Sequence, residues 1–174
     1  MTDYDSFAKA YSAENESNLF NAYYERPEML RLVGDVSGRR ILDAGCGSGP
    51  LTAALRDSGA LVTGFDASAA MVDLARQRLG GDADLHEADL GAPLPFADAE
   101  FDDVDYLMDG QTVWLTFWHR PLHAMTNAFA AAGFRIAVLS EPPPAANTPP
   151  ELLPPTLGEG QSFLCFLFFV LEAV

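Results

Sequence analysis

The sequence predicts an α/β protein with a doubly wound, mostly parallel sheet, an N-terminal helical cap and an antiparallel last strand. Two observations predict this class. Short apolar runs at residues 41–44, 61–65 and 84–86 alternate with helical patterns, which is typical of parallel strands joined by crossover helices. The first run breaks into three alternating glycines within residues 45–49, where the backbone can lie close to a ligand.

The elements before the glycines form the predicted cap. Residues 5–33 carry apolar side chains at helical spacing, and Pro27 favours the start of a new helix. After the glycines, a helix over 51–56 begins at Pro50, where the missing N–H of proline costs nothing.

A second crossover helix is predicted over 68–79. Ser68 is its expected N-cap, and Gly80-Gly81 is its stop signal. A fourth strand is expected at residues 101–104, so the sheet would continue beyond the first three strands.

The last third of the chain predicts a hairpin, a helix and two more strands. Asp109-Gly110 between apolar residues indicates a hairpin turn, followed by a strand over 113–117. A helix is expected over 121–132, a strand over 134–139 and a buried antiparallel last strand over 163–171. Seven of the twelve prolines lie within residues 142–155 and indicate an extended surface loop.

The spacing of the glycines indicates the kind of ligand. The dinucleotide fingerprint G-x-G-x-x-G would place its last glycine where this chain has Pro50. The stretch from Asp43 to Gly49 instead resembles motif I of class I S-adenosylmethionine (SAM)-dependent methyltransferases, an acidic residue followed by G-x-G-x-G. Asp66 and Asp89 follow the next two strands, where that family also carries acids.

This resemblance implies a Rossmann-like fold and a set of cofactor contacts. Asp43 would face the methionine ammonium, Asp66 would accept from both ribose hydroxyls, and Asp89 would accept from the adenine amino group. The glycines would pass close to the methionine and ribose, with further expected contacts from Cys46, Ala67, Met71, Leu90, Tyr11 and Tyr24. Three alternatives stay open: Asp43 could cap the turn, Asp66 could be a helix N-cap, and Tyr11 and Tyr24 could simply pack in the core.

Composition agrees with one enzyme domain. The 174 residues include ten basic residues and carry a net charge of −15, which disfavours nucleic acid and anionic membrane surfaces as partners. The apolar runs are too short to span a bilayer, so we expect a cytoplasmic protein. The family resemblance implies a small-molecule substrate. Carboxylates attract the cationic SAM, which has no phosphate, and would repel a pyrophosphate. The two cysteines indicate small buried side chains, with Cys46 disfavoured as a nucleophile.

The chain departs from the family after its fourth strand. A helix, a loop and a fifth strand are expected there, yet Val104 is followed at once by the hairpin, as if a segment were missing. We therefore expect one domain with a cap over 1–38, a cofactor-binding half over 39–104 and a C-terminal part over 105–174. A missing segment could leave SAM binding without turnover, and it would expose a sheet edge that a homodimer could cover.

The sequence gives only a weak indication of the residues that bind or deprotonate the methyl acceptor. His119 is the candidate general base or substrate ligand, against a packing or capping role. A zinc site at His119 and His123 is disfavoured because Pro121 restricts the helix there, and no metal is predicted. The leading function is methyl transfer from SAM, yielding S-adenosylhomocysteine (SAH). The alternatives are a SAM-binding protein without turnover and a nicotinamide or nucleotide-sugar enzyme.

Overall fold

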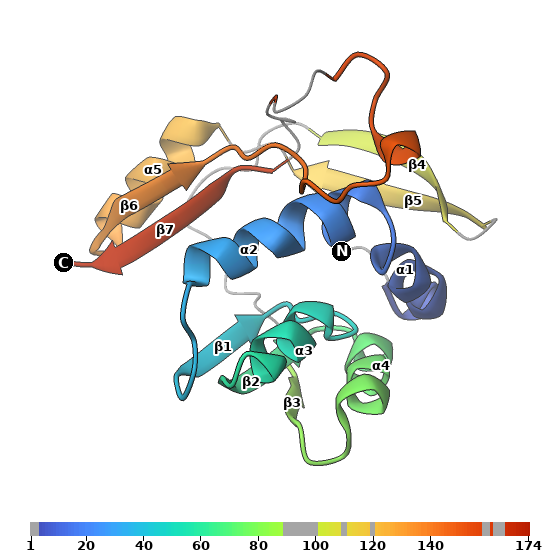
Figure 1. The fold of residues 1–174 in the computed structure, drawn as a ribbon, viewed down its shortest axis with the longest axis horizontal. Helices are drawn as coiled ribbons and strands as arrows, with labels where there is room; N and C mark the ends of the chain where they lie inside the picture. The colour runs from blue at the N-terminus through green and yellow to red at the C-terminus, as the bar shows by residue number, and fades with distance from the viewer. Residues whose placement is uncertain (1–3, 89–100, 109–110, 119–120, 158–160, 162–165) are drawn as a thin grey trace.

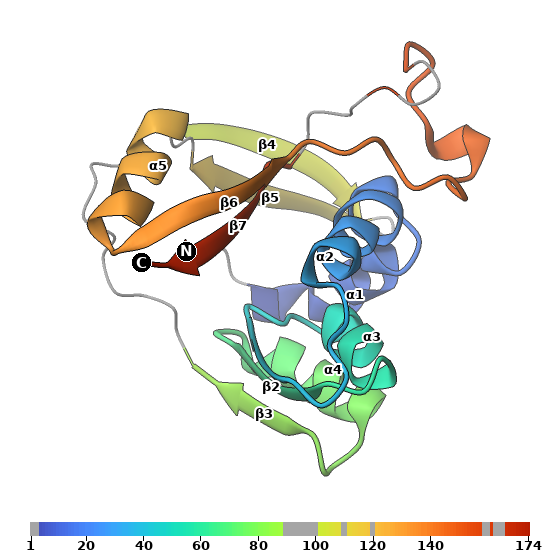
Figure 2. The same ribbon diagram turned by 60° about the vertical axis from the view of Figure 1, so that its left-hand side comes forward.

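A computed structural model describes residues 4–88, 101–108, 111–118, 121–157, 161 and 166–174 of the chain. The strands in these ranges form a three-stranded parallel sheet and two separate antiparallel pairs. Helix α2 lies between the parallel sheet and the pair β6–β7 in Figure 1, and Figure 2 shows it above α3 and beside that pair. In this part of the chain, no helix combines the length and the apolar character that crossing a bilayer requires.

The N-terminal segment is helical, as predicted. It contains η1 (Tyr4–Ser6), α1 (Ala8–Asn15), the π-helical turn η2 (Asn21–Glu25) and α2 (Arg26–Val33). Pro27 lies in the first turn of α2, where its missing N–H leaves no partner unsatisfied. The π-helical turn runs directly into α2 and has no counterpart in the sequence prediction.

The parallel sheet and its helices follow the predicted order. They are β1 (Arg40–Ala44), α3 (Pro50–Asp57), β2 (Leu61–Asp66), α4 (Ala69–Leu79) and β3 (Asp84–Glu87). The strands lie in the order β1-β2-β3, and both pairings are parallel. The predicted caps are confirmed as well. The Ser68 hydroxyl accepts a hydrogen bond from the Met71 N–H at 3.1 Å, and Gly80 ends α4 with a φ of +93°.

One face of the parallel sheet is covered and the other is open. Val62 of β2 belongs to a core cluster with side chains of α2 and α3, and Leu85 of β3 packs with side chains of α4. On the opposite face, Leu42 and Leu61 keep more than 60% of their surface exposed. Among the described residues, helices therefore cover only one side of β1–β3.

Strands β4 (Phe101–Met108) and β5 (Gln111–Trp118) form an antiparallel pair. Met108 lies opposite Gln111, as the predicted Asp-Gly hairpin requires, although the two turn residues themselves lie outside the described ranges. The expected fourth strand is corrected in one respect: it pairs with β5 in a sheet of its own and does not extend the parallel sheet. The junction placed after Val104 lies inside β4.

The C-terminal part contains α5 (Leu122–Ala131), β6 (Phe134–Ser140), η3 (Pro150–Leu152) and β7 (Phe168–Ala173). The helix ends before Gly133, whose φ is +81°, and β7 is antiparallel to β6, as predicted. The last strand begins at Phe168, and Phe168 is its only buried residue, so the prediction of a buried strand from residue 163 is wrong for its described part. Residues 162–165 lie outside the described ranges.

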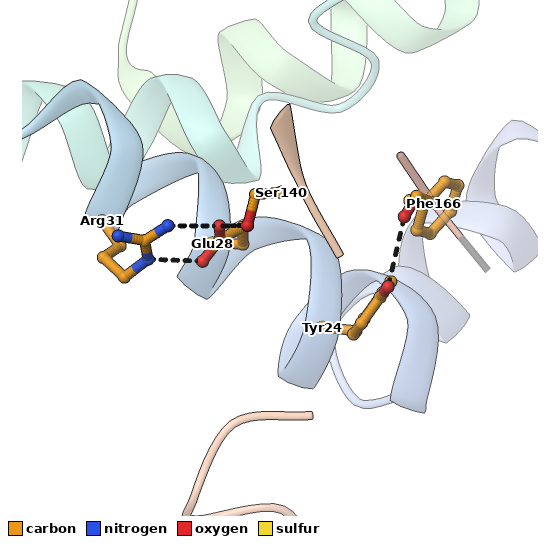
Figure 3. Close-up of polar contacts among 5 residues, drawn as sticks. All are labelled: Tyr24, Glu28, Arg31, Ser140 and Phe166. Atoms are coloured by element: carbon orange, nitrogen blue, oxygen red, sulfur yellow. Dashed lines mark hydrogen bonds and ion pairs between the residues drawn. The ribbon is translucent and has the colours of Figure 1, made fainter. Parts of the chain in front are cut away.

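Two side chains of the N-terminal helices tie this C-terminal part to the rest of the molecule (Figure 3). Glu28, only 5% exposed, accepts two hydrogen bonds of 2.6 Å from Arg31 and a third from the Ser140 hydroxyl at the end of β6. The Tyr24 hydroxyl donates to the Phe166 carbonyl at 3.2 Å, and its ring packs on Phe168.

Candidate functional site

A cavity of about 200 Å³ lies where β1 and β2 end. Its lining side chains and backbone come from the N-terminal helices, the glycine turn, the end of β2 and α4. They are Tyr4, Tyr11, Gly45, Gly47, Asp66 and Met71. Ligands of parallel α/β sheets bind beyond the carboxyl ends of the strands, and the cavity has this position.

The glycine turn presents bare backbone to the cavity. Gly45 and Cys46 donate their N–H groups to the Phe65 carbonyl at 2.9 and 3.0 Å, which fixes the turn against β2. Gly47 has a φ of +54°, and a Cβ placed there would meet no atom within 4 Å. The space beside Gly47 is therefore open to a ligand, while its backbone angle disfavours any side chain.

Gly49 has a different role in the turn. Its φ of +79° starts α3, and an added Cβ would lie 3.1 Å from Leu79 and 3.2 Å from Ala75. The structure thus gives Gly49 a packing function between α3 and α4. Gly49 and Asp43 are not among the residues that line the cavity.

Asp66 connects the glycine turn to the start of α4. Its Oδ2 accepts the Gly47 N–H at 2.9 Å, and its Oδ1 accepts the Ser68 N–H at 2.9 Å. Ser68 is the N-cap of α4, so Asp66 does not take that position. An ionised carboxylate has about four acceptor positions, and these two bonds leave capacity for ligand hydroxyls.

Asp43 at the end of β1 accepts a hydrogen bond from the Thr52 hydroxyl at 2.6 Å. Its partner is thus a side chain of α3, and the alternative of a cap on the turn backbone has no recorded bond in the described residues. Burial raises the pKa of Asp43, and the nearby charge of Asp66 raises it further. A cation that approached Asp43 would stabilise its ionised form.

Glu25 is a residue of this region that the sequence prediction missed. It ends the π-helical turn η2, and burial raises the pKa of its carboxyl group, as does the charge of Asp43. Its charge also acts on Tyr11. Nothing in the sequence indicated Glu25, because only the π-helical turn determines which way residue 25 faces.

Aromatic side chains of the N-terminal segment close the cavity. The ring centroids of Tyr4 and Tyr11 lie 5.3 Å apart at an angle of 81°, and both rings pack near Phe7. Burial raises the pKa of Tyr11 to about 12, so its hydroxyl is a neutral donor at physiological pH. Tyr24 is not among the described residues that line this cavity: it lies 1% exposed against Phe166 and Phe168, and it lines a separate cavity beside α2.

The remaining predicted contacts divide into three groups. Met71 lines the cavity, and Ala67 follows Asp66 at an exposed position. Cys46 is buried beneath the turn, and burial raises the pKa of its thiol to about 12, which is unsuitable for a nucleophile. Asp89, Leu90 and His119 lie outside the described residues.

The chemistry of the lining fits a cationic nucleoside without phosphate. Asp66 is the only charged side chain among the described residues that line the cavity, and Asp43 lies close enough to affect its surroundings electrostatically. Neither Lys nor Arg lines the cavity in this described set, so a pyrophosphate would lie beside the Asp66 carboxylate with no side-chain cation among these lining residues to offset the repulsion. The residues present therefore suit SAM better than a dinucleotide.

Comparisons with known proteins identify the family to which the chain belongs. The pattern of a family described as "Methyltransferase domain" matches residues 41–133. A demethylmenaquinone methyltransferase of Clavibacter sepedonicus is 38% identical over 104 residues, which are 58% of this chain and 42% of that protein. A magnesium-protoporphyrin O-methyltransferase of Rhodobacter capsulatus is 38% identical over 69 residues, covering 37% of this chain and 31% of that protein. The chain thus spans less than half the length of these relatives.

A solved structure shows the fold. A protein of Listeria monocytogenes, described as an S-adenosylmethionine-dependent methyltransferase, superposes with a TM-score of 0.52 at 16% identity. The superposition covers 74% of this chain and 89% of that one. The Rossmann-like class predicted from the sequence is thereby confirmed.

Proposed function

We propose, from the premise that this chain belongs to the methyltransferase-domain family, that it binds SAM and transfers the methyl group to a small-molecule acceptor. One observation carries the proposal. The open backbone of Gly47 and the carboxylate of Asp66 face one cavity at the carboxyl ends of two parallel strands. The two relatives described above are methyltransferases of small molecules.

The site residues have distinct roles in this proposal. Asp66 accepts the ribose hydroxyls, Asp43 faces the methionine ammonium, and the rings of Tyr4 and Tyr11 exclude water from the cavity. Asp89 remains the proposed acceptor for the adenine amino group. These groups hold the cofactor in one orientation through side chains that are fixed by Gly47, Ser68 and Thr52.

The methyl transfer depends mainly on the alignment of the acceptor with the methyl group. When bound, SAM supplies a methyl group on a sulfonium leaving group, so the protein has to orient the acceptor and exclude water. Positioning of this kind contributes about 7–11 kcal/mol to rate acceleration. His119 is the proposed base for an acceptor that must lose a proton.

Calorimetric titration with SAM, SAH and NAD tests the cofactor. We expect SAM and SAH to bind and NAD not to bind. Asp66→Asn retains an acceptor oxygen for the Ser68 N–H but loses the negative charge, so we expect SAM affinity to fall about tenfold to hundredfold. Asp57→Asn, at an exposed position at the end of α3, removes the same charge and should leave the affinity unchanged.

Binding of NAD in place of SAM would contradict the proposal. So would equal SAM affinities of the Asp66→Asn variant and the unchanged protein. Circular dichroism of each variant separates a loss of binding from a loss of folding.

A second function, SAM binding without turnover, is favoured by one observation. In the described residues β1 is an edge strand of the parallel sheet, and β4 pairs with β5 in a separate sheet. Transfer of labelled methyl from SAM to a panel of phenols, quinols, carboxylates and amines distinguishes the two functions. Tight SAM binding with no labelled product would support the binding protein.

The cellular setting is a further part of the proposal. We place the protein in the cytoplasm as a single domain, with a homodimer as its expected assembly. The exposed Leu42 and Leu61 on the open face of the parallel sheet support an association between copies. Sedimentation at several protein concentrations tests the dimer, and a constant monomer mass would exclude it.

A further inference from the structure

Arg78 in the last turn of α4 joins two segments that border the cofactor cavity. Its Nε donates to the Ser48 carbonyl in the glycine turn at 2.9 Å. Its Nη2 donates to the carboxylate of Glu16, directly after α1. The planar guanidinium has donors that point in different directions, so one Arg side chain can hold both acceptors at once.

The segment that Arg78 holds is the wall of the cavity. We call residues 4–16 the cap segment; it contains Tyr4 and Tyr11, which line the cavity. At its other end, Asp5 accepts hydrogen bonds from the Ser68 hydroxyl at 2.5 Å and from the Ala70 N–H at 3.0 Å. The cap segment is therefore attached near both ends of α4, with Tyr11 between the two attachments and Tyr4 directly before the first.

The turn that Arg78 holds is the other wall. Ser48 is 3% exposed, and its carbonyl lies between Gly47, which borders the cavity, and Gly49, which packs on α4. A hydrogen bond to this carbonyl restrains the peptide unit that joins Ser48 to Gly49. The same side chain thus restrains both the turn and the cap segment.

We propose that Arg78 is a positioning residue that couples the cap segment to the glycine turn, so that the cavity closes around its ligand as one unit. This inference rests on the proposed function, because the ligand is SAM or SAH. Arg78 does not line the cavity and acts through Glu16 and Ser48.

Energetics distinguish this role from simple stabilisation. Glu16 is 42% exposed, and exposed ion pairs contribute little to folding. Loss of the Arg78–Glu16 pair should therefore change the stability little. It should, however, lower the fraction of molecules with a closed cap, and the apparent affinity falls in proportion to that fraction.

The test compares Arg78→Gln, Glu16→Gln and their double variant with the unchanged protein. We expect Arg78→Gln to lower the affinity for SAM and SAH about tenfold, chiefly through faster dissociation. Glu16→Gln should lower the affinity less. The double variant should bind like Arg78→Gln alone, because both changes interrupt the same connection. Arg78→Lys should fall between, since an ammonium cannot hold both acceptors in the same way.

Arg76→Gln is the matched control. Arg76 lies on the same helix and donates to the Leu85 carbonyl at 3.1 Å and to Asp73, but it contacts neither the turn nor the cap segment. Its substitution should lower the stability at least as much as Arg78→Gln and leave ligand affinity unchanged. Equal loss of affinity in Arg76→Gln and Arg78→Gln would overturn the inference, as would unchanged affinity in Arg78→Gln.

Hydrogen exchange of the ligand-free protein provides a second measurement. Arg78→Gln should speed exchange in both residues 4–16 and residues 45–49, and unchanged exchange there would overturn the coupling. This measurement needs no ligand. A failure of the unchanged protein to bind SAM would refute the proposed function, while the exchange experiment would still decide the role of Arg78.

Discussion

Carboxyl groups gather at the proposed methionine end of the site, and Arg26 is the cation that acts on one of them among the described residues. Burial raises the pKa of Glu25 and Asp43, and each raises the pKa of at least one neighbour through its negative charge. Arg26 lowers the pKa of Glu25, but its guanidinium donates to the backbone and side chain of Asn15. A ligand ammonium placed here would relieve the repulsion.

The raised pKa of Asp43 predicts a coupling between binding and protonation. An ammonium stabilises the ionised carboxylate, so binding should release protons as the pH approaches the ordinary value of 3.8 from above, and affinity should fall there. Calorimetry at about pH 5 in buffers of different ionisation enthalpy measures this release. Asp43→Asn should reduce the proton release to the part that comes from Glu25, and it should weaken SAM binding about tenfold at neutral pH.

The same shift has a definite sign for stability. A raised pKa means that the folded chain holds the proton more tightly than the unfolded chain. The stabilisation from this group is therefore present at low pH and lost as the pH rises through the folded pKa. Asp43→Asn retains an acceptor for Thr52 and should unfold at higher urea than the unchanged protein at neutral pH. A lower midpoint at neutral pH would contradict this account.

At the scale of elements, the position of the glycine turn depends on a fourth glycine beneath it. Gly64 in β2 lies beside Cys46, and an added Cβ would be 2.8 Å from Leu85 Cδ2 and 3.3 Å from Cys46 Sγ. The turn can lie this close to β2 only because residue 64 has no side chain. The absence of a side chain at Gly64 therefore allows the glycine turn to lie close to β2.

Gly64→Ala should displace the turn and destabilise the fold. Overpacking of a dense site costs about 1–3 kcal/mol, so the urea midpoint should fall and SAM binding should weaken. Gly81→Ala is the control, because a Cβ there meets no atom within 4 Å and its φ is unremarkable for an L-residue. Equal stability of the two variants would show that β2 and the turn can separate at little cost.

At the scale of the whole molecule, the described N-terminal and C-terminal parts are joined beside α2. Glu28 is buried there, and hydrogen bonds from Arg31 hold its pKa below the ordinary 4.5, with a smaller contribution from Ser140. Burial acts in the opposite direction. The link from α2 to the end of β6 is thus strongest while the Glu28 carboxylate is ionised (Figure 3).

This link predicts sensitivity to acid. Because the folded pKa of Glu28 is depressed, its stabilisation is present above 4.5 and is lost as the pH falls through the folded pKa. Glu28→Gln should cost about 1–2 kcal/mol at neutral pH, and the difference from the unchanged protein should fade in acid. Urea unfolding at several pH values measures it, with hydrogen exchange reporting whether β6 and β7 loosen first.

Glu14→Gln is the control for this experiment, since Glu14 is exposed on α1. Its stability should follow that of the unchanged protein at every pH. A constant difference between Glu28→Gln and the unchanged protein down to low pH would show that the charge of Glu28 does not support the junction.

The sequence by itself determined the local structure of this protein. The start of α4 at Ser68 and its end at Gly80 follow from backbone groups that a few neighbouring residues satisfy, so they can be predicted without knowledge of the fold. The alternation of strands and helices likewise predicted β1–β3 as parallel strands. Asp66 and Gly47 could be placed together because adjacent parallel strands end at the same edge of a sheet.

Only the tertiary structure decided which distant segments meet. The separation of β4 from the parallel sheet, the burial of Tyr24 against Phe168 and the two contacts of Arg78 depend on segments that lie far apart in the chain. A side chain's neighbours across such separations depend on how whole elements pack, and periodicity along the sequence carries no information about them. Glu25 was missed because no local signal in the sequence indicated the π-helical turn that contains it.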